Sequence, residues 1–375
     1  MALLFVNGRV LVDGVLRTDV SVLVDGARIA ALLPADARAN AETVDLAGDI
    51  LAPGFIDTQV NGGGGVLFND APTAATIAAI GGAHRRFGTT GFLPTLISDD
   101  PPVIARAIAA VDQAIEDGVP GVLGIHIEGP FLNVARRGIH LASKIRQIDH
   151  ASVDLVTLLR GGRTLVTLAP ELATPELIQA LVARGAVVAG GHSDARYDEA
   201  RAAVAAGMTG ATHLFNAMSP LGNREPGMVG AVLDSPGVIA GIVVDGRHVH
   251  PATLRIAIAA RGADAFMLVT DAMPTVGGGS SFMLQGKRIE VRDGVCVDEA
   301  GTLAGSDLDM ARAVRNAVGL IGLPLETALA MASAVPARFL GLEAEYGRIA
   351  PGMRASLVRL TAALEVVQSW IDGAA

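Results

Sequence analysis

From about residue 51 the chain alternates short apolar strand patterns with amphipathic helical patterns, and this alternation restricts its possible folds more than any other feature. Helical patterns occupy segments that include 73–87, 102–118, 175–185 and 198–207. Eight apolar segments are predicted to be strands: 51–59, 89–96, 121–128, 163–170, 186–192, 209–213, 238–245 and 265–271. Because most of the eight strands precede a helix, the sequence predicts a closed (β/α)8 TIM-type barrel rather than an open sheet.

The two ends of the chain have a different pattern, with short β segments separated by Asn-Gly and Asp-Gly turns. We expect residues 1–50 plus 341–375 to form a small β-sandwich domain. The residues between them in the sequence, 51–340, are expected to form a catalytic barrel. The segment 282–306 alternates like a set of hairpins, so it is predicted to leave the barrel after the eighth strand. Two further helices, at about 307–319 and 324–334, are expected to complete the barrel.

Composition excludes several classes of function. The net charge is −9, from 29 basic and 38 acidic residues without a basic cluster, which argues against nucleic-acid and polybasic membrane binding. The single Cys296 cannot form an internal disulfide and suits a reducing compartment. No apolar run reaches the ~18 residues of a membrane span. We therefore expect a cytoplasmic protein that has neither nucleic acid nor membrane as a partner.

The polar residues at the carboxyl ends of the predicted strands are candidate site residues, because barrel enzymes place their chemistry there. Glu128, His192 and His213 end the third, fifth and sixth strands. A single histidine in such a position is usually a hydrogen-bonded structural residue. One carboxylate and two imidazoles together form a common zinc-binding set that leaves a coordination position open.

Two more residues are candidates for catalysis. Asp271 ends the eighth strand and either accepts a proton as a general base or caps the following turn. His140 lies in the loop after the third strand, where it either polarises a substrate carbonyl or is an ordinary solvated histidine. Spacing alone does not decide between these alternatives.

Loops after the sixth and seventh strands carry candidates for binding an anion. Arg224 could bind phosphate through its rigid fork, although loop arginines more often form surface salt bridges. His248 lies in a similar loop, and the backbone N–H groups of Asn216 and Ala217 are further candidate donors. The glycine run 62–65 lacks the P-loop pattern, so no nucleotide site is predicted.

The order of the motifs resembles that of the N-acetylglucosamine-6-phosphate deacetylases in the amidohydrolase superfamily. The similarity extends over nearly the whole chain. The motifs are PGFIDTQVNGGGG, GFLPTLI, GIHIEGPFLN, RRGIH, LAPE, GGHSDA, ATHLFNAM, REPG, VVDGRHVH and LVTDAMP. This resemblance implies hydrolysis of the N-acetyl group of N-acetylglucosamine 6-phosphate, which gives glucosamine 6-phosphate and acetate.

The resemblance also implies roles for individual residues. Metal ligands of the family match Glu128, His192 and His213; its acid/base matches Asp271; and the residue that polarises the acetyl carbonyl matches His140. The residues that bind sugar and phosphate match Asn216, Ala217, Arg224 and His248. In the family the phosphate site lies at a dimer interface, with one of the last two contributed by the neighbouring subunit, so a homodimer is expected.

Gln59 and Asn61 occupy positions where some family members carry histidines and bind two metals. Neutral amides are poor ligands for transition metals, and the fourth strand ends in LAPE without the lysine of many superfamily relatives. The expected cofactor is therefore one divalent ion per subunit, zinc with iron or manganese as alternatives. Two other readings remain: another amidohydrolase, dihydroorotase-like or D-aminoacylase-like, and a non-catalytic scaffold.

Overall fold

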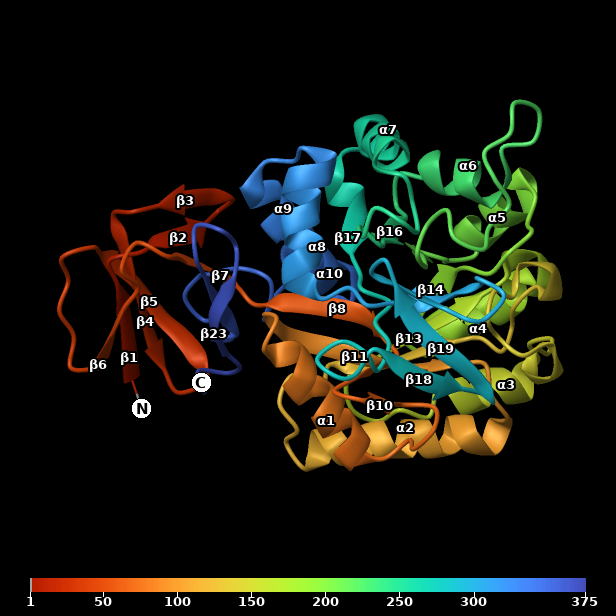
Figure 1. Cartoon of the computed structure of the whole chain (residues 1–375), viewed down its shortest axis with the longest axis horizontal. Helices are drawn as coiled ribbons and strands as arrows, with labels where there is room; N and C mark the ends of the chain where they lie inside the picture. The colour runs from red at the N-terminus through yellow and green to blue at the C-terminus, as the bar shows by residue number, and fades with distance from the viewer. Residues whose placement is uncertain (1) are drawn as a thin grey trace.

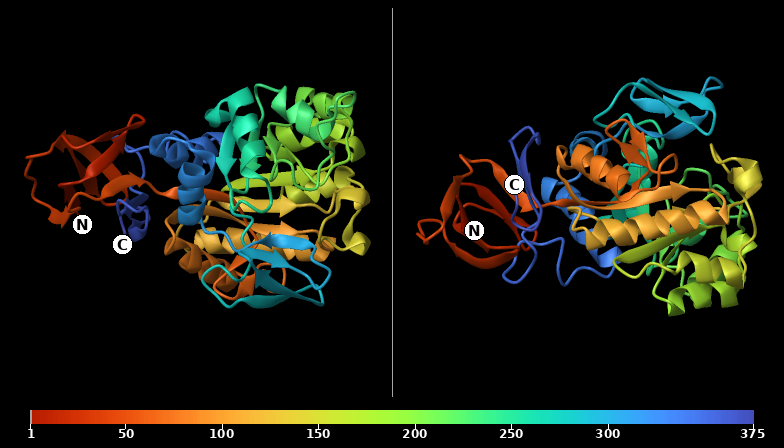
Figure 2. Two further views of the ribbon diagram at one scale, coloured as in Figure 1. Left: turned by 45° about the horizontal axis from the view of Figure 1, so that its top comes forward. Right: turned by 90° about the horizontal axis from the view of Figure 1, so that it is seen from below.

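The computed structural model describes residues 2–375, and its largest feature is an eight-stranded parallel sheet that curls almost into a closed barrel (Figures 1 and 2). Neighbouring strands in the sheet are consecutive along the chain, as expected for repeated β-α units. The strands are β8 (Phe55–Val60), β11 (Thr89–Ile97), β12 (Gly124–Glu128), β13 (Arg163–Leu168), β14 (Val187–Gly190), β15 (Gly210–Ala211), β16 (Ile239–Ile242) and β17 (Phe266–Leu268). The predicted (β/α)8 barrel is confirmed.

The barrel closes between β8 and β17 through isolated contacts. Val60 and Ala272 form a single parallel bridge. Beside this bridge, the buried carboxylate of Asp57 accepts hydrogen bonds from the backbone N–H and the hydroxyl of Thr270. The backbone N–H of Gln59 donates to the same carboxylate. Burial raises the pKa of Asp57 to about 7, so the seam contains a carboxyl group that titrates near neutral pH.

The helices pack against the outside of the barrel. Several begin after a side chain that accepts a first-turn N–H, including Thr73, Thr174 and Asp309. The helices are α1 (Ala74–Arg85), α2 (Pro101–Glu116), α3 (His150–Val156), α4 (Pro175–Ala183), α5 (Tyr197–Ala205), α6 (Gly227–Leu233), α7 (Pro251–Arg261), α8 (Met310–Asn316), α9 (Leu325–Ala332) and α10 (Ala334–Phe339). Within residues 2–375, no helix is long and apolar enough to cross a membrane.

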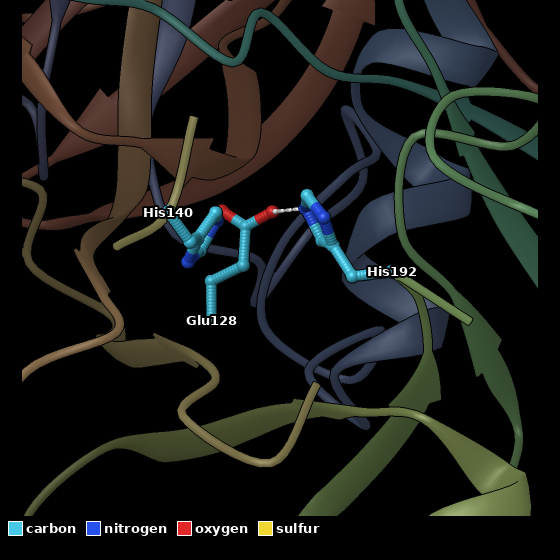
Figure 3. A group of neighbouring side chains, drawn as sticks. All are labelled: Glu128, His140 and His192. Atoms are coloured by element: carbon cyan, nitrogen blue, oxygen red, sulfur yellow. Dashed lines mark hydrogen bonds and ion pairs between the residues drawn. The ribbon is translucent and has the colours of Figure 1, made fainter. Parts of the chain in front are cut away.

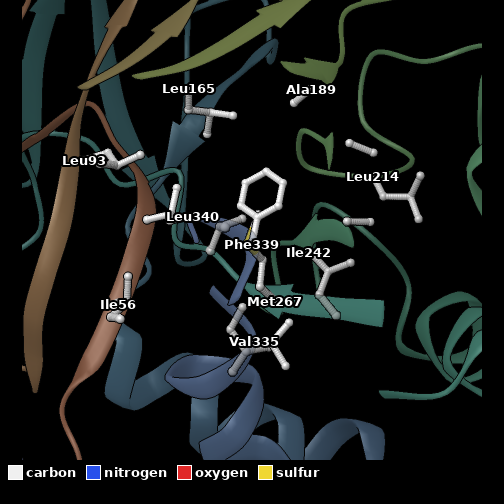
Figure 4. Packing of buried hydrophobic residues seen from close by; sticks show 14 of the residues in the cluster. Ile56, Leu93, Leu165, Ala189, Leu214, Ile242, Met267, Val335, Phe339 and Leu340 are labelled. Atoms are coloured by element: carbon white, nitrogen blue, oxygen red, sulfur yellow. The ribbon is translucent and has the colours of Figure 1, made fainter. Parts of the chain in front are cut away.

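One end of the barrel is filled by Phe339, which extends from α10 into the interior (Figure 4). It packs among apolar side chains of the strands, including Leu165, Ala189 and Met267. A Cβ at Gly210 would lie only 2.8 Å from the Phe339 ring, so this position of β15 needs glycine. The barrel interior is therefore a packed core here.

The two ends of the chain form a β-sandwich beside the barrel, at the left of Figure 1. The ring centroids of Phe5 and Trp370, from opposite sheets, lie 4.9 Å apart in an edge-to-face contact. One sheet has the order β5-β4-β1-β6 and the other β23-β22-β7-β2-β3. The strands are β1 (Ala2–Val6), β2 (Arg9–Val12), β3 (Val15–Arg17), β4 (Val20–Asp25), β5 (Arg28–Pro34), β6 (Glu42–Asp45), β7 (Ile50–Pro53), β22 (Leu357–Leu360) and β23 (Val366–Trp370). The predicted sandwich is confirmed, whereas the domain boundaries stay a prediction.

The segment 51–59, predicted to be one strand, contains parts of two strands. Residues before Gly54 belong to β7 in the sandwich, and residues after it belong to β8 in the barrel. A Cβ at Gly54 would come within 2.0 Å of the Thr90 side chain, so the chain passes very close to β11 at this point. The apolar pattern continues through the junction because both strands are buried, which hides the change of sheet.

The predicted excursion after the eighth strand is an antiparallel sheet of order β18-β19-β20-β21. It stands out from the barrel at the top of the right-hand view in Figure 2. Its buried side chains Ile289 and Cys296 pack with Ile97 at the end of β11. The strands are β18 (Ser281–Leu284), β19 (Lys287–Arg292), β20 (Val295–Val297) and β21 (Leu303–Ser306); a small hairpin, β9 (Gly62–Gly63) and β10 (Val66–Leu67), follows β8.

Candidate active site and metal centre

A cavity of about 350 Å³ lies at the carboxyl ends of the barrel strands. Its lining includes most of the residues that the sequence predicted for the site: Glu128, His140, His192, His213, Asn216, Ala217, His248 and Asp271. Arg224 is exposed on the loop before α6 and does not line the cavity of its own chain. The structure thus brings together the predicted catalytic and metal-binding side chains but leaves Arg224 apart from them.

Glu128, His192 and His213 converge on one point. Oε1 of Glu128 lies 3.1 Å from Nε2 of His192 and 3.0 Å from Nε2 of His213. The two Nε2 atoms are themselves 3.0 Å apart. Tetrahedral ligands at the ~2.0–2.1 Å distances of zinc lie roughly 3.3–3.4 Å from one another, so a small expansion would accommodate an ion.

The electrostatics of this trio favour a positive charge at its centre. Burial alone would raise the pKa of Glu128, but the adjacent His192 and His213 rings hold it well below its ordinary value. Burial alone would lower the pKa of His213, but the hydrogen bond and charge of Glu128 raise it. An ionised carboxylate beside two imidazoles is chemically suited to a divalent cation.

Ligand atoms of Glu128, His140 and His192 also lie within 4.8 Å of one another, which offers His140 as an alternative third ligand (Figure 3). Ser98 decides between the alternatives. Its backbone nitrogen lies 3.3 Å and its hydroxyl oxygen 2.8 Å from Nδ1 of His140. Because a backbone N–H can only donate, Nδ1 accepts and the ring proton is on Nε2. A protonated nitrogen cannot bind a metal, so the geometry favours His213.

His140 is instead suited to donate a hydrogen bond into the cavity. Its side chain is buried, and this burial lowers its pKa to about 3. The ring is therefore neutral at physiological pH, with its Nε2 proton available. A neutral, fixed donor of this kind can stabilise negative charge on a carbonyl oxygen.

His192, His213 and Asp271 all have left-handed backbone conformations, with φ values of 48°, 30° and 52°. Non-glycine residues in this region typically carry roughly 1–3 kcal/mol of strain. The strands before these residues end at Gly190, Ala211 and Leu268, respectively. Each of the three residues therefore lies just beyond the end of its strand. The left-handed turn directs the chain out of the strand at the residue that faces the cavity. The sequence patterns located these residues but gave no sign of their conformation.

Asp271 is held by the two amides at the end of β8. Its Oδ1 accepts hydrogen bonds from Nδ2 of Asn61 at 2.7 Å and from Nε2 of Gln59 at 3.1 Å. The same Gln59 nitrogen lies 3.1 Å from Oε2 of Glu128. Burial and the negative charge of Glu128 raise the pKa of Asp271 to about 6. Gln59 and Asn61 thus act as donors to carboxylates, and Asp271 is ready to exchange a proton near neutral pH.

The anion-binding prediction receives a partial correction. The backbone N–H of Asn216 donates to the carbonyl oxygen of His213, so this group is already occupied. The Asn216 side chain donates to the same oxygen. His248 is fixed by Asp245, whose Oδ2 lies 2.5 Å from Nδ1 of the ring. His248 therefore presents its other ring nitrogen, Nε2, as the free one.

His126, another polar residue near a strand end, has a structural role. Its ring lies inside the barrel and its two nitrogens contact the hydroxyls of Thr95 and Thr167. Burial lowers the pKa of His126 to about 4, so the ring is neutral. It does not line the cavity.

The sequence reasoning missed several residues of the cavity and its support. Ser98 directly follows β11, so the strand-end rule could have found it. Thr302 and Leu303 line the cavity from the excursion, outside the barrel pattern. Arg136 acts through its backbone carbonyl, which accepts a hydrogen bond from Nδ1 of His192 at 2.9 Å. A backbone contact of this kind leaves no signal in the residue types.

A (β/α)8 barrel with a buried carboxylate and imidazoles at the carboxyl ends of its strands defines a class, the barrel hydrolases with a metal-binding site. The chain belongs to the amidohydrolase family, because the model of that family matches residues 50–374. The candidate metal-binding set is thus found in a metal-dependent family.

Three relatives indicate where the chain lies within the family. The N-acetylgalactosamine-6-phosphate deacetylase of Shewanella sp. (strain ANA-3) is 46% identical over 325 residues, which cover 86% of this chain and 82% of that protein. The N-acetylglucosamine-6-phosphate deacetylase of Haemophilus influenzae is 37% identical over 360 residues, with coverages of 95% and 94%. The N-acetylglucosamine-6-phosphate deacetylase from Pasteurella multocida has a crystal structure that matches this one with a TM-score of 0.96. Its sequence is 36% identical, and the match covers 100% of this chain and 99% of that chain. The predicted resemblance is confirmed.

Proposed function

We propose that the protein hydrolyses the N-acetyl group of N-acetylglucosamine 6-phosphate and releases glucosamine 6-phosphate and acetate. The observation that carries this proposal is the convergence of Glu128, His192 and His213 beside Asp271 in one cavity. The names of the similar proteins supply the substrate class, a phosphorylated N-acetyl amino sugar.

We propose that Glu128, His192 and His213 hold one divalent ion, zinc in the first instance, with iron and manganese as alternatives. The close approach of two ring nitrogens and one carboxylate oxygen supports this assignment. When bound, such an ion polarises a carbonyl oxygen and lowers the pKa of a coordinated water towards ~7. The Gln59 and Asn61 side chains are engaged as donors to carboxylates, which supports a single ion.

Asp271 is the proposed general base and acid. Its carboxylate takes a proton from the attacking water, and it later gives that proton to the amine nitrogen as the C–N bond breaks. A pKa of about 6 suits both steps, because the group is mostly ionised at neutral pH yet still basic enough to accept a proton. Asn61 and Gln59 hold one carboxylate oxygen, which orients the other towards the reaction.

His140 is the proposed donor to the acetyl carbonyl oxygen. Ser98 fixes the ring with its proton on Nε2, and burial keeps it neutral. A preorganised donor of this kind typically contributes about 3–4 kcal/mol to transition-state stabilisation.

His248, Asn216, Ala217 and Arg224 are proposed to bind the sugar and its phosphate. The first three line the cavity, whereas Arg224 is exposed on its own chain. We therefore propose a homodimer in which Arg224 of one subunit reaches the cavity of the other. We also propose a cytoplasmic location, which is expected from the single Cys296. The proposed domains divide at residues 50 and 341.

Release of acetate from N-acetylglucosamine 6-phosphate, measured with and without a chelator, tests this function. We expect turnover that the chelator removes and zinc restores. N-acetylgalactosamine 6-phosphate is a second candidate substrate, because a protein named for it is 46% identical. Comparing kcat/KM for the two epimers identifies the preferred substrate, and turnover of neither would contradict the proposal.

A further inference from the structure

Glu171 lies just beyond the end of β13, in the short 3-10 helix Pro170–Leu172, and it accepts three hydrogen bonds. Oε1 accepts from Nδ2 of Asn133 at 2.9 Å and from the backbone nitrogen of Asp194 at 2.7 Å. Oε2 accepts from the hydroxyl of Ser193 at 2.7 Å. One carboxylate thus joins the loop after β12 to the loop after β14.

The loop after β14 contains His192, and the loop after β12 contacts it. The backbone nitrogen of Asn133 donates to the His192 carbonyl at 2.9 Å, while Ser193 and Asp194 directly follow His192 in the chain. His192 has a left-handed backbone with φ of 48°, a conformation that a non-glycine residue keeps only when its surroundings hold it. The residues on which Glu171 acts therefore support the backbone of His192 at its carbonyl oxygen and at the two residues that follow it.

The ring of His192 is fixed through the same cluster. The carbonyl oxygen of Arg136 lies 2.9 Å from Nδ1, so Nδ1 carries the proton and Nε2 presents its lone pair towards Glu128. Nε of Arg136 donates to Oδ1 of Asp194 at 2.8 Å. Because Glu171 holds the backbone nitrogen of Asp194, the contacts connect Glu171 to the His192 ring as well as to its backbone.

We propose that Glu171 is a positioning residue that holds Nε2 of His192 in place for the metal. This inference rests on the proposed metal site. Glu171 is distant in sequence from each of the proposed ligands, and it acts through Asn133, Ser193 and Asp194. Partners that orient metal ligands typically change metal affinity or activity by about 10–100-fold when they are removed.

The test measures zinc affinity by competition with a chromophoric chelator, at a temperature well below the unfolding transition of each variant. Glu171→Ala is expected to weaken zinc binding by about 10–100-fold. Glu171→Gln is expected to retain affinity within about fivefold, because its carbonyl oxygen can replace Oε1 and its amide can donate to the Ser193 hydroxyl. The matched control is Glu176→Gln, an exposed carboxylate at the start of α4, which should bind zinc like the wild type.

Unchanged zinc affinity in Glu171→Ala, even with a lower Tm, overturns the positioning role, because a purely structural residue would give that result. If Glu171→Ala does not fold, Ser193→Ala removes one of the three hydrogen bonds and should still weaken zinc binding severalfold. Zinc affinity equal to wild type in that variant also overturns the role. His192→Ala separates this inference from the proposed metal site: if His192→Ala binds zinc as tightly as the wild type, the ligand assignment itself is wrong.

Discussion

Asn61 donates a hydrogen bond of 2.7 Å from its side-chain nitrogen to Oδ1 of Asp271. This contact lowers the pKa of Asp271, against the burial and the charge of Glu128 that together raise it to about 6. It stabilises the ionised form of the proposed general base.

Replacing Asn61 by alanine should move the acidic limb of the kcat/KM profile to higher pH. Asp271 must be ionised to accept a proton, so activity rises with pH through its pKa of about 6. Loss of the Asn61 hydrogen bond removes a contact that lowers this pKa, and the limb should follow. A profile of acetate release from pH 5 to 8 measures the shift; a limb that stays at the wild-type pH would show that Asn61 does not tune Asp271.

The Asp271→Asn substitution should lower kcat by about 10²–10⁴, the usual contribution of a general acid–base group. The amide has nearly the same shape but cannot accept the proton. The Glu128, His192 and His213 side chains remain, so metal content should stay at the wild-type level. Acetate release and metal analysis on the same sample check both expectations. Near-normal turnover with metal bound would remove Asp271 from its assigned role.

Asp57 should make the protein less stable as the pH rises from about 4 to about 7. Its folded pKa of about 7 lies above the ordinary value of 3.8, so the folded state retains a proton that the unfolded state releases. The stability therefore falls by roughly 4 kcal/mol for this group across this interval. Above the interval this contribution is constant.

The Asp57→Asn variant isolates this effect, because an amide can still accept hydrogen bonds from the backbone N–H groups of Gln59 and Thr270. Its stability relative to wild type should increase between pH 4.5 and pH 7.5. Urea unfolding at the two pH values measures the difference. A difference that does not depend on pH would mean that Asp57 is ionised in the folded protein.

Removal of the metal should lower the Tm. An ion that binds only the folded state stabilises it by roughly 2.7 kcal/mol when its concentration is 100 times its Kd. Thermal unfolding with added zinc and with a chelator measures this difference. His213→Ala is the control, because it lacks one proposed ligand and its Tm should respond only weakly to zinc. An equal response in both proteins would locate the zinc elsewhere.

The fold was accessible from the sequence because buried parallel strands leave continuous apolar segments and their helices leave a different period. An apolar pattern does not separate two buried strands that meet without an intervening polar residue, as β7 and β8 do at Gly54. Because Gly54 has no side chain, the backbone passes close to Thr90, a tertiary contact that no local pattern contains.

The candidate site was accessible for a different reason. Glu128 ends β12 and His213 follows β15, and the ends of such strands must meet at one rim, so strand ends alone bring the two residues together. The supporting contacts were not accessible, because they use loop conformations and backbone atoms. The tautomer of His140 depends on the N–H of Ser98, and that of His192 on the carbonyl of Arg136. A residue type carries no information about such contacts.

The proposed dimeric phosphate site should allow two impaired variants to complement each other. Arg224→Ala and His248→Ala should each reduce kcat/KM for the phosphorylated sugar far more than for N-acetylglucosamine, because both residues are assigned to the phosphate. In a mixed dimer, the cavity with an intact His248 faces the subunit with an intact Arg224. Mixing the two proteins under conditions of subunit exchange should therefore restore activity to about a quarter of the sites. No recovery in mixtures whose exchange is verified by tagged subunits would mean that Arg224 does not act across an interface.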